Sequence, residues 1–339
     1  MSDRTQCTKI GEYVSSDLPI SYGIPQGSIL GPTLFIIYIN DLCSLRMGGK
    51  IISYADDTAM IFEGDNWENT YKAAQLGFNA VSSWLSQNVL TLNTAKTKFL
   101  CFSIRNSTQP SSELTLIAHS SHCVSEECSC DRLDKCNIIK YLGVIVDQNL
   151  NFRSHIELLC GRVRKLIYIF KNLRHVMKPD LLKRIYYALC ESLLTYCISS
   201  WGGAYKTILI HLEYAQRTIL KVINFKPYRF PTIELYRSYK VLNVRQLFIL
   251  ATILHQHSKT PYDPVAPTKR RKNIICSQVK CNTHFSNNFL PFLGPFLYNR
   301  INGYCFIHPL NRQECKHKVK EWLLLRTYDE TEDLLKPIR

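Results

Sequence analysis

The chain has 339 residues, and 46% of them are hydrophobic. It is therefore too apolar for a disordered protein, and it is long enough for one large domain or two ordinary ones. The 42 Lys and Arg side chains outnumber the 27 Asp and Glu side chains, which leaves a formal net charge of +15. An excess of that size favours a polyanion such as nucleic acid as the partner.

Targeting signals are the next feature that the sequence addresses. Residues 1–17 contain no apolar core of the kind that a secretory signal needs. The longest apolar run, residues 34–39, is far shorter than the about 20 residues that cross a bilayer. The 14 cysteines follow no regular framework, which favours reduced thiols. We therefore expect an intracellular protein of the cytoplasm or nucleus, with no signal peptide, transmembrane segment or membrane partner, and of unknown oligomeric state.

The first predicted element is a helix that contains the apolar run at residues 34–39. It follows the loop GIPQGS, in which Gly23 and Gly27 bracket Pro25 and Gln26. Such a loop lets the backbone approach a ligand closely. An ordinary capped, buried helix explains the same residues, so the loop alone leaves both interpretations open.

Two short apolar runs, residues 51–55 and 58–62, flank Asp56 and Asp57. Runs of that length around two turn-forming residues predict a β-hairpin with both carboxylates at its tip. Adjacent carboxylates repel each other, and a hard divalent cation such as Mg²⁺ offsets that repulsion. Aspartate is also common in turns, so a solvated turn is the alternative.

The remaining elements are mostly helical. Apolar residues at three- and four-residue steps predict an amphipathic helix between residues 67 and 90. Short apolar runs predict strands at 99–102 and 141–146. Further helices are predicted at residues 154–175, 180–200, 244–255 and 312–326. Pro179 separates two of these helices because proline suits a first turn, and the stretch with Pro291 and Pro295 is predicted to be turn-rich.

Charge is unevenly spread along the chain. Residues 1–150 hold 11 basic and 15 acidic side chains, whereas residues 151–230 hold 14 basic and 4 acidic ones. Helices with such an excess predict contact with a nucleic-acid backbone. A solvated helix face is the alternative, although such faces usually mix both signs.

Four motifs in a fixed order give the sequence a family resemblance. Residues 23–35 (GIPQGSILGPTLF) and 54–57 (YADD) closely resemble motifs B and C of reverse transcriptases from non-LTR retrotransposons, particularly arthropod Jockey-like elements. Residues 84–102 (WLSQNVLTLNTAKTKFLCF) resemble motif D, and residues 140–147 (KYLGVIVD) resemble motif E. The helices up to about Phe225 resemble the thumb, and the later segments resemble the tail of such elements.

The resemblance implies an α+β fold. It consists of a partial right-hand polymerase palm at residues 1–150, an all-helical thumb at 151–230, and a mostly helical tail with a closing helix at 231–339. The implied activity is that of an RNA-directed DNA polymerase. Its partners would be an RNA template, a DNA primer and deoxynucleotides, and its cofactor would be a pair of Mg²⁺ ions.

The resemblance also assigns roles to individual residues. Asp56 and Asp57 would be the catalytic, metal-binding carboxylates, and Lys96 would neutralise the departing pyrophosphate, with a solvated lysine as the alternative. The nucleotide and template pocket would be lined by Gly23, Pro25, Gln26, Gly27, Tyr54 and Ala55. The primer grip would consist of Tyr141, Leu142 and Gly143. The nucleic-acid backbone would contact Arg162, Arg164, Lys165, Lys171, Arg174, Lys183 and Arg184.

One departure from the family pattern limits these expectations. The family's motif A precedes motif B and supplies another metal-binding aspartate, but Asp3, Glu12 and Asp17 do not lie in such a context. The resemblance therefore implies an N-terminally truncated reverse transcriptase without motif A or fingers, and we expect negligible polymerase activity from this chain alone. The alternatives are a non-catalytic nucleic-acid-binding module and a non-functional transposon relic.

Two groups of cysteines and histidines are candidate zinc ligands. The denser group is His122, Cys123, Cys128, Cys130 and Cys136. The looser group is Cys276, Cys281, His284, Cys305, His308, Cys315 and His317. Neither group has a paired CxxC spacing, so we do not expect zinc in this protein.

Overall fold

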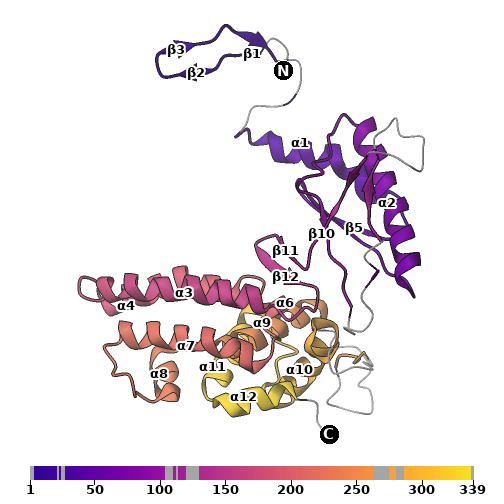
Figure 1. The fold of residues 1–339 in the computed structure, drawn as a ribbon. Coiled ribbons are helices and arrows are strands. Elements are labelled where there is room, and N and C mark those ends of the chain that lie inside the picture. The colour runs from indigo at the N-terminus through magenta and orange to yellow at the C-terminus, as the bar shows by residue number, and fades with distance from the viewer. Residues whose placement is uncertain are drawn as a thin grey trace. The chain divides into compact units, whose positions relative to one another are not determined.

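The computed structural model of the chain describes residues 4–20, 23, 27–103, 110–111, 114–119, 130–262, 275–279 and 286–336. These residues form a mixed helical and strand structure that divides into two compact units, Met1–Asn137 and Ile138–Arg339 (Figure 1). The boundary lies before the segment that resembles motif E, so this segment shares a unit with the helices that follow it. The predicted three-part division into palm, thumb and tail stays a prediction.

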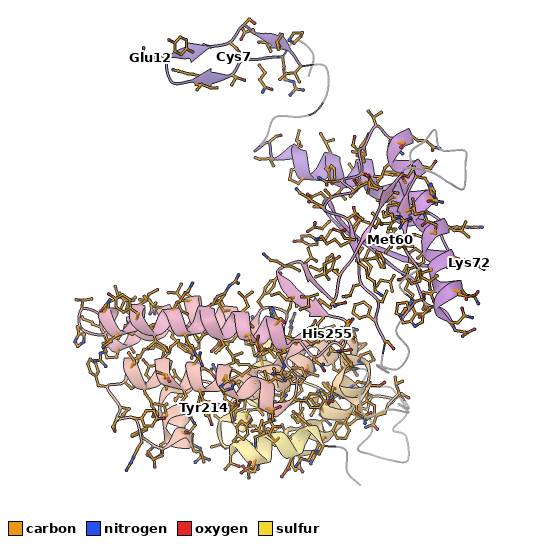
Figure 2. The ribbon with its side chains drawn as sticks, viewed as in Figure 1. Cys7, Glu12, Met60, Lys72, Tyr214 and His255 are labelled. Carbon is orange, nitrogen blue, oxygen red and sulfur yellow. The ribbon has the colours of Figure 1, made fainter. Side chains whose placement is uncertain are left out.

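The first unit begins with small antiparallel ladders and continues with a hairpin and a long helix. Its first ladders are β1 (Thr5–Gln6) with β4 (Leu18–Pro19), and β2 (Lys9–Ile10) with β3 (Tyr13–Val14), around Cys7 and Glu12 (Figure 2). The next elements are α1 (Leu30–Ile39), η1 (Asn40–Ser44), β5 (Lys50–Tyr54), β6 (Asp57–Ile61) and α2 (Trp67–Gln87). The remaining strands are β7 (Lys98–Phe99), β8 (Ile117–Ala118), β9 (Asp131–Arg132) and β10 (Asp134–Lys135). The strands described here pair two by two, so no larger sheet forms among them.

The β5–β6 hairpin packs against α2. Helix α2 begins where the Asn66 side chain accepts a hydrogen bond from the Asn69 backbone at 2.8 Å, and it buries Phe78 and Val81 on one face. The Phe62 ring, just after β6, lies so close to Gly77 of α2 that a Cβ atom there would be 2.5 Å away. Glycine therefore permits the close approach of the hairpin to the helix.

The second unit is a helical assembly that begins with a second hairpin. The hairpin consists of β11 (Ile138–Tyr141) and β12 (Val144–Asp147). The helices that follow are α3 (Arg153–Leu173), α4 (Pro179–Tyr186), the π-helical η3 (Tyr187–Glu191), α5 (Ser192–Thr195), α6 (Ile198–Trp201) and α7 (Lys206–Ile223). The last ones are α8 (Thr232–Tyr239), α9 (Val244–Lys259), η4 (Ser286–Asn288), α10 (Leu290–Cys305), α11 (Arg312–Leu324) and α12 (Tyr328–Leu335). Among the described residues, no helix is long and apolar enough to span a membrane.

Helix α9 is the centre of this unit. Its first residues are buried on all sides, including Arg245 and Gln246, and it packs against α7, α10 and α11. A capping box starts it: Asn243 accepts from the Gln246 backbone at 2.8 Å, and Gln246 accepts from the Asn243 backbone at 3.1 Å. The boundary at Pro179 is confirmed, since Pro179 occupies the first turn of α4.

Five predicted elements differ from the structure. The helix predicted at 180–200 is interrupted at Cys197, which has a φ angle of 49°, and the strand predicted at 99–102 is only the two-residue β7. The expected strand at residues 141–146 is instead a hairpin, because Leu142 and Gly143 turn the chain with positive φ angles of 45° and 81°. The stretch expected to be turn-rich forms α10, with Pro291 in its first turn and Pro295 inside the helix. The helix predicted at 312–326 is α11, which ends at Leu324 and is followed by α12.

Candidate functional site

The YADD residues form the tip of the β5–β6 hairpin, as the alternation of apolar and turn residues predicts. Tyr54 pairs with Asp57, so the two-residue loop is Ala55-Asp56 and Asp57 is the first residue of β6. Ala55 has a φ angle of 52°, a left-handed conformation that costs a residue with a side chain about 1–2 kcal/mol. Below the loop, the Ser53 and Thr58 hydroxyl oxygens are 3.1 Å apart across the strands. The two carboxylates thus lie at the tip of a tightly turned hairpin, Asp56 in the loop and Asp57 at the start of β6.

Apolar packing supports this loop from below. Ile51 in β5 and Met60 in β6 lie opposite each other in the ladder (Met60 is labelled in Figure 2). Both pack against a small core that includes Met47, which precedes β5, and Val81 of α2. Because the strands are held by side chains from a neighbouring helix, the hairpin has a fixed position within the first unit.

The surroundings of the two aspartates are open. Asp56, Asp57 and Tyr54 are exposed, and within the described residues neither carboxylate forms an ion pair or a side-chain hydrogen bond. In the same part of the chain, no group of three or more His, Cys, Asp or Glu side chains could hold a metal ion. Oxygen ligands suit Mg²⁺, which binds through one or two carboxylates plus substrate phosphates. The pair therefore fits a hard divalent ion chemically but supplies only part of its coordination.

The other predicted residues of the first unit are placed as follows. Gly23 and Gly27 have φ angles of 83° and 80°, a backbone conformation that favours glycine, and a Cβ atom at either would meet nothing within 4 Å. Pro25 and Gln26 lie outside the described residues. Lys96 is exposed at the end of a turn in which its backbone N–H donates to the Asn93 side chain at 3.1 Å. Neither its amine nor either YADD carboxylate has an ion-pair partner among the described residues, so the structure does not join them.

The predicted primer-grip residues lie at the β11–β12 hairpin of the second unit. Leu142 and Gly143 both have positive φ angles, as a tight two-residue hairpin turn requires. The Tyr196 hydroxyl donates a hydrogen bond to the Leu142 carbonyl at 2.7 Å. A Cβ atom at Gly143 would be 3.4 Å from the Tyr196 ring, so the turn packs directly against this ring. The Trp201 indole in turn donates to the Tyr196 carbonyl at 2.9 Å.

The seven basic residues predicted to contact nucleic acid divide into two groups. Arg162, Arg164, Lys165, Lys171 and Arg184 are exposed, and no ion pair of the described residues involves them. Arg174 donates to the Val222 carbonyl at 3.3 Å and covers the Phe225 ring at 4.6 Å. Lys183 lies 5.7 Å from the centre of the Tyr239 ring. The first group is thus available to a polyanion, whereas the last two cations also have contacts within the protein.

Comparison with known proteins identifies residues 5–146, which comprise nearly all of the first unit and the first hairpin of the second. Residues 5–146 match the family of reverse transcriptases (RNA-dependent DNA polymerases). These residues belong to the reverse transcriptase family. The match contains Gly23, Gly27 and the YADD hairpin, as well as the β11–β12 turn. The resemblance to reverse transcriptases that the motifs predicted is confirmed.

Relatives of this reverse transcriptase domain come from insect retrotransposons. The chain is 25% identical over 254 residues to "RNA-directed DNA polymerase from mobile element jockey" of Drosophila melanogaster. The aligned region covers 71% of the chain and 26% of that protein. It is 28% identical to the jockey polymerase of Drosophila funebris, over 66% of the chain and 24% of that protein. It is 22% identical to "Probable RNA-directed DNA polymerase from transposon X-element" of Drosophila melanogaster, over 82% of the chain and 29% of that protein. No solved structure matches the chain at a significant level.

The chain spans about a quarter of the length of the first of these relatives. Their similarity to it extends past the reverse transcriptase domain into the helical unit, since the longest of these matches covers 82% of the chain. Part of the second unit is therefore included in the similarity to these retrotransposon polymerases.

One contact around the reverse transcriptase domain could not be predicted from its motifs. Tyr196, which holds the candidate primer grip, lies 54 residues from its partner Leu142 and carries no local signal. The candidate zinc ligands Cys130 and Cys136 are described, whereas His122, Cys123 and Cys128 lie outside the described residues, as do Cys281 and His284 of the looser group.

Proposed function

We propose that this chain is the part of an RNA-directed DNA polymerase that holds catalytic metal ions at Asp56 and Asp57 and binds a primer–template duplex through α3 and α4. The single observation that carries this proposal is the YADD pair on a supported hairpin tip, inside a segment that matches reverse transcriptases. In this proposal residues 1–150 are palm, 151–230 are thumb and 231–339 are tail.

The proposed chemistry is attack of a primer 3′-oxygen on the α-phosphorus of a deoxynucleotide. Mg²⁺, when bound, would stabilise the negative charge on the attacking and leaving oxygens. Asp56 and Asp57 would hold the ion, Tyr54 and Ala55 would lie beside the primer end, and Lys96 would neutralise the pyrophosphate. Pro25 and Gln26 would line the nucleotide pocket with Gly23 and Gly27.

Metal-directed cleavage tests the proposed ion site on the 339-residue chain. We expect Fe²⁺ with ascorbate to cut the backbone near residues 54–57, because Fe²⁺ occupies oxygen-ligand sites that also bind Mg²⁺. Excess Mg²⁺ should suppress this cut, and the double variant Asp56→Asn/Asp57→Asn should lose it. Asp65→Asn is the matched control, because Asp65 is an exposed aspartate of the same unit. The same cutting pattern in the double variant would reject the ion site.

A second candidate function, a nucleic-acid-binding module without catalysis, is favoured by the exposed cations of α3 and α4. If the five exposed side chains each neutralise one phosphate, the logarithm of the affinity for duplex falls with log salt at a slope of about −4 to −5. Filter binding at several salt concentrations measures it. Arg162→Gln/Arg164→Gln/Lys165→Gln should flatten the slope by about 3.

The control for this measurement is the triple variant Lys9→Gln/Lys72→Gln/Lys135→Gln, which removes three exposed charges from the first unit. It should leave the slope nearly unchanged. If both triple variants flatten the slope equally, binding depends only on the net charge of the chain. That result would reject both duplex binding by a thumb and a nucleic-acid-binding module at α3 and α4. If only the α3 variant does so, binding belongs to α3, and the metal experiment decides between polymerase and module.

A further inference from the structure

The last turn of α3 and the last turn of α7 meet at one end of the helical unit (Figure 1). The Arg174 guanidinium, just after α3, donates a hydrogen bond to the Val222 carbonyl of α7 at 3.3 Å. It also lies over the Phe225 ring, 4.6 Å from the ring centre, and the centres of the His175 and Phe225 rings are 5.8 Å apart. These contacts join the two helix ends, and we call residues 171–178 and 221–229 together the α3–α7 tip.

Two aromatic rings of the α3–α7 tip face solvent. Phe225 is 59% exposed and Tyr228 is 92% exposed, and neither belongs to the core of the helical unit. The φ angle of Phe225 is 51°, a left-handed conformation in which a bulky side chain is strained. Aromatic side chains stabilise a fold mainly by burying their large apolar surface. The two rings therefore contribute little to folding and remain available to a partner.

A cation lies over each of these rings. Arg174 covers Phe225, and the Lys221 ammonium group lies 5.3 Å from the centre of the Tyr228 ring. Lys221 also donates a hydrogen bond to the Tyr228 carbonyl, which fixes the cation beside the loop. A cation is attracted to one face of an aromatic ring, and the opposite face can still stack on a flat group. The exposed surface of each ring thus suits a planar group from outside the chain.

The α3–α7 tip carries positive charge without nearby acids in the sequence. Residues 158–179 and 214–233 contain no Asp or Glu, and Asp180 and Glu234 are the first acids beyond them. Among the described residues, no ion pair involves the six cations of the tip, which are Lys171, Arg174, Lys178, Lys221, Lys226 and Arg229. Such a surface attracts a polyanion. Charge and rings together suit a polyanion that also exposes planar groups.

We propose that the α3–α7 tip binds an unpaired strand of RNA, with bases stacked on Phe225 and Tyr228 and phosphates beside the cations. Proteins that bind single strands combine cations along the backbone with aromatic rings on which bases stack. A duplex keeps its base faces inside its own stack, so it cannot use the rings. This site goes beyond duplex binding by α3 and α4. It rests on the proposed function only for the choice of RNA, because the template is the strand that is unpaired outside the duplex.

Fluorescence anisotropy with an unstructured RNA of about 12 nucleotides tests this proposal on the 339-residue chain. Tyr228→Ala should weaken binding about tenfold, because it removes one base–ring stack. The salt dependence of binding should keep its slope, since no charge is removed. Tyr228→Phe keeps the ring and should bind as the unaltered chain does. Tyr13→Ala is the matched control, because Tyr13 is an 86% exposed tyrosine of the first unit, and it should leave binding unchanged.

Two further probes separate stacking from charge. An RNA backbone of the same length without bases, and a blunt duplex, should each bind Tyr228→Ala as they bind the unaltered chain. No binding of the RNA, unchanged RNA binding in Tyr228→Ala, or an equal loss for all three probes would overturn the proposal. If Tyr228→Ala instead abolishes binding to phosphatidylserine vesicles and leaves RNA binding unchanged, the tip is a membrane-binding surface.

The outcome is independent of the duplex experiment on α3. If Arg162→Gln/Arg164→Gln/Lys165→Gln leaves the salt slope for duplex unchanged while RNA binding still requires the Tyr228 ring, the thumb assignment fails and the RNA site stands. If the duplex slope flattens in that triple variant while RNA binding is indifferent to Tyr228→Ala, the RNA site fails and the thumb assignment stands.

Discussion

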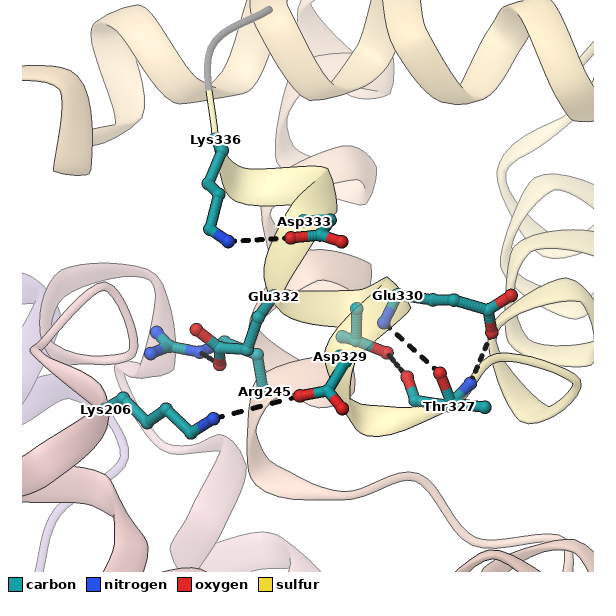
Figure 3. A network of polar contacts seen from close by, with 9 residues as sticks. Lys206, Arg245, Thr327, Asp329, Glu330, Glu332, Asp333 and Lys336 are labelled. Atoms are coloured by element: carbon teal, nitrogen blue, oxygen red, sulfur yellow. Dashed lines mark hydrogen bonds and ion pairs between the residues drawn. The ribbon is translucent and has the colours of Figure 1, made fainter.

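Replacement of Arg245 by alanine should lower the free energy of unfolding of the second unit by about 3–5 kcal/mol. The Arg245 and Glu332 side chains are only 4% and 17% exposed, and 2.6 Å separates the Arg245 Nε from a carboxylate oxygen (Figure 3). Alanine would leave the Glu332 charge buried without its partner. It would also remove the donors that satisfy the Gly202 and Ala204 carbonyls. Urea unfolding followed by tryptophan fluorescence measures the loss, since Trp201 is fully buried in this unit.

A second ion pair provides the control, because its acidic residue, like Glu332, lies in α12. Lys206 and Asp329 are 3.9 Å apart, and their side chains are 50% and 90% exposed. Lys206→Ala should therefore cost at most about 1 kcal/mol. The apolar double variant Arg245→Met/Glu332→Leu should recover much of the loss, because breaking a buried pair costs more than replacing it. A loss in Arg245→Ala no larger than that in Lys206→Ala would contradict this account of the unit's stability.

Local patterns predicted much of the secondary structure. The two apolar runs around Asp56 and Asp57 predicted the hairpin, although its loop is Ala55-Asp56, one residue earlier than expected. This shift follows from the pairing of Tyr54 with Asp57, which the composition of the runs does not determine. Pro295 suggested a turn, but α10 is buried on most of its surface, and tertiary packing outweighs the local cost of one proline.

Contacts between distant residues could not be predicted from the sequence. The periodicity of α7 predicts which of its faces is buried, but it does not predict that Lys206, at the start of α7, lies 3.9 Å from Asp329, over a hundred residues later. The same holds for Tyr196, whose hydroxyl fixes the Leu142 turn. The family motifs located the candidate catalytic residues, because those residues are adjacent in the chain.

The two YADD carboxylates lead to an expectation about catalysis. The YADD pair is exposed, and among the described residues no third carboxylate, cysteine or histidine joins it in a group that could hold a metal ion. A two-ion reaction needs ligands for both ions, and each such part is worth several kcal/mol of barrier. We therefore expect no Mg²⁺-dependent primer extension by the purified 339-residue chain on an RNA template.

A chimera tests whether the YADD pair can be catalytic when other ligands are present. Residues that precede the matched region in the jockey protein of Drosophila melanogaster would be joined to this chain, and template-directed extension should then arise. In the chimera, Asp56→Asn should lower the rate at least about 10³-fold, equivalent to about 4 kcal/mol of barrier, because a neutral amide holds the ion far less strongly than a carboxylate. Asp65→Asn, an exposed change in the same unit, should keep the rate.

Two outcomes would contradict these expectations. If the 339-residue chain alone extends a primer and Asp56→Asn abolishes this extension, the YADD pair is sufficient and no further ligands are needed. An active chimera that is indifferent to Asp56→Asn would refute the catalytic role of the hairpin.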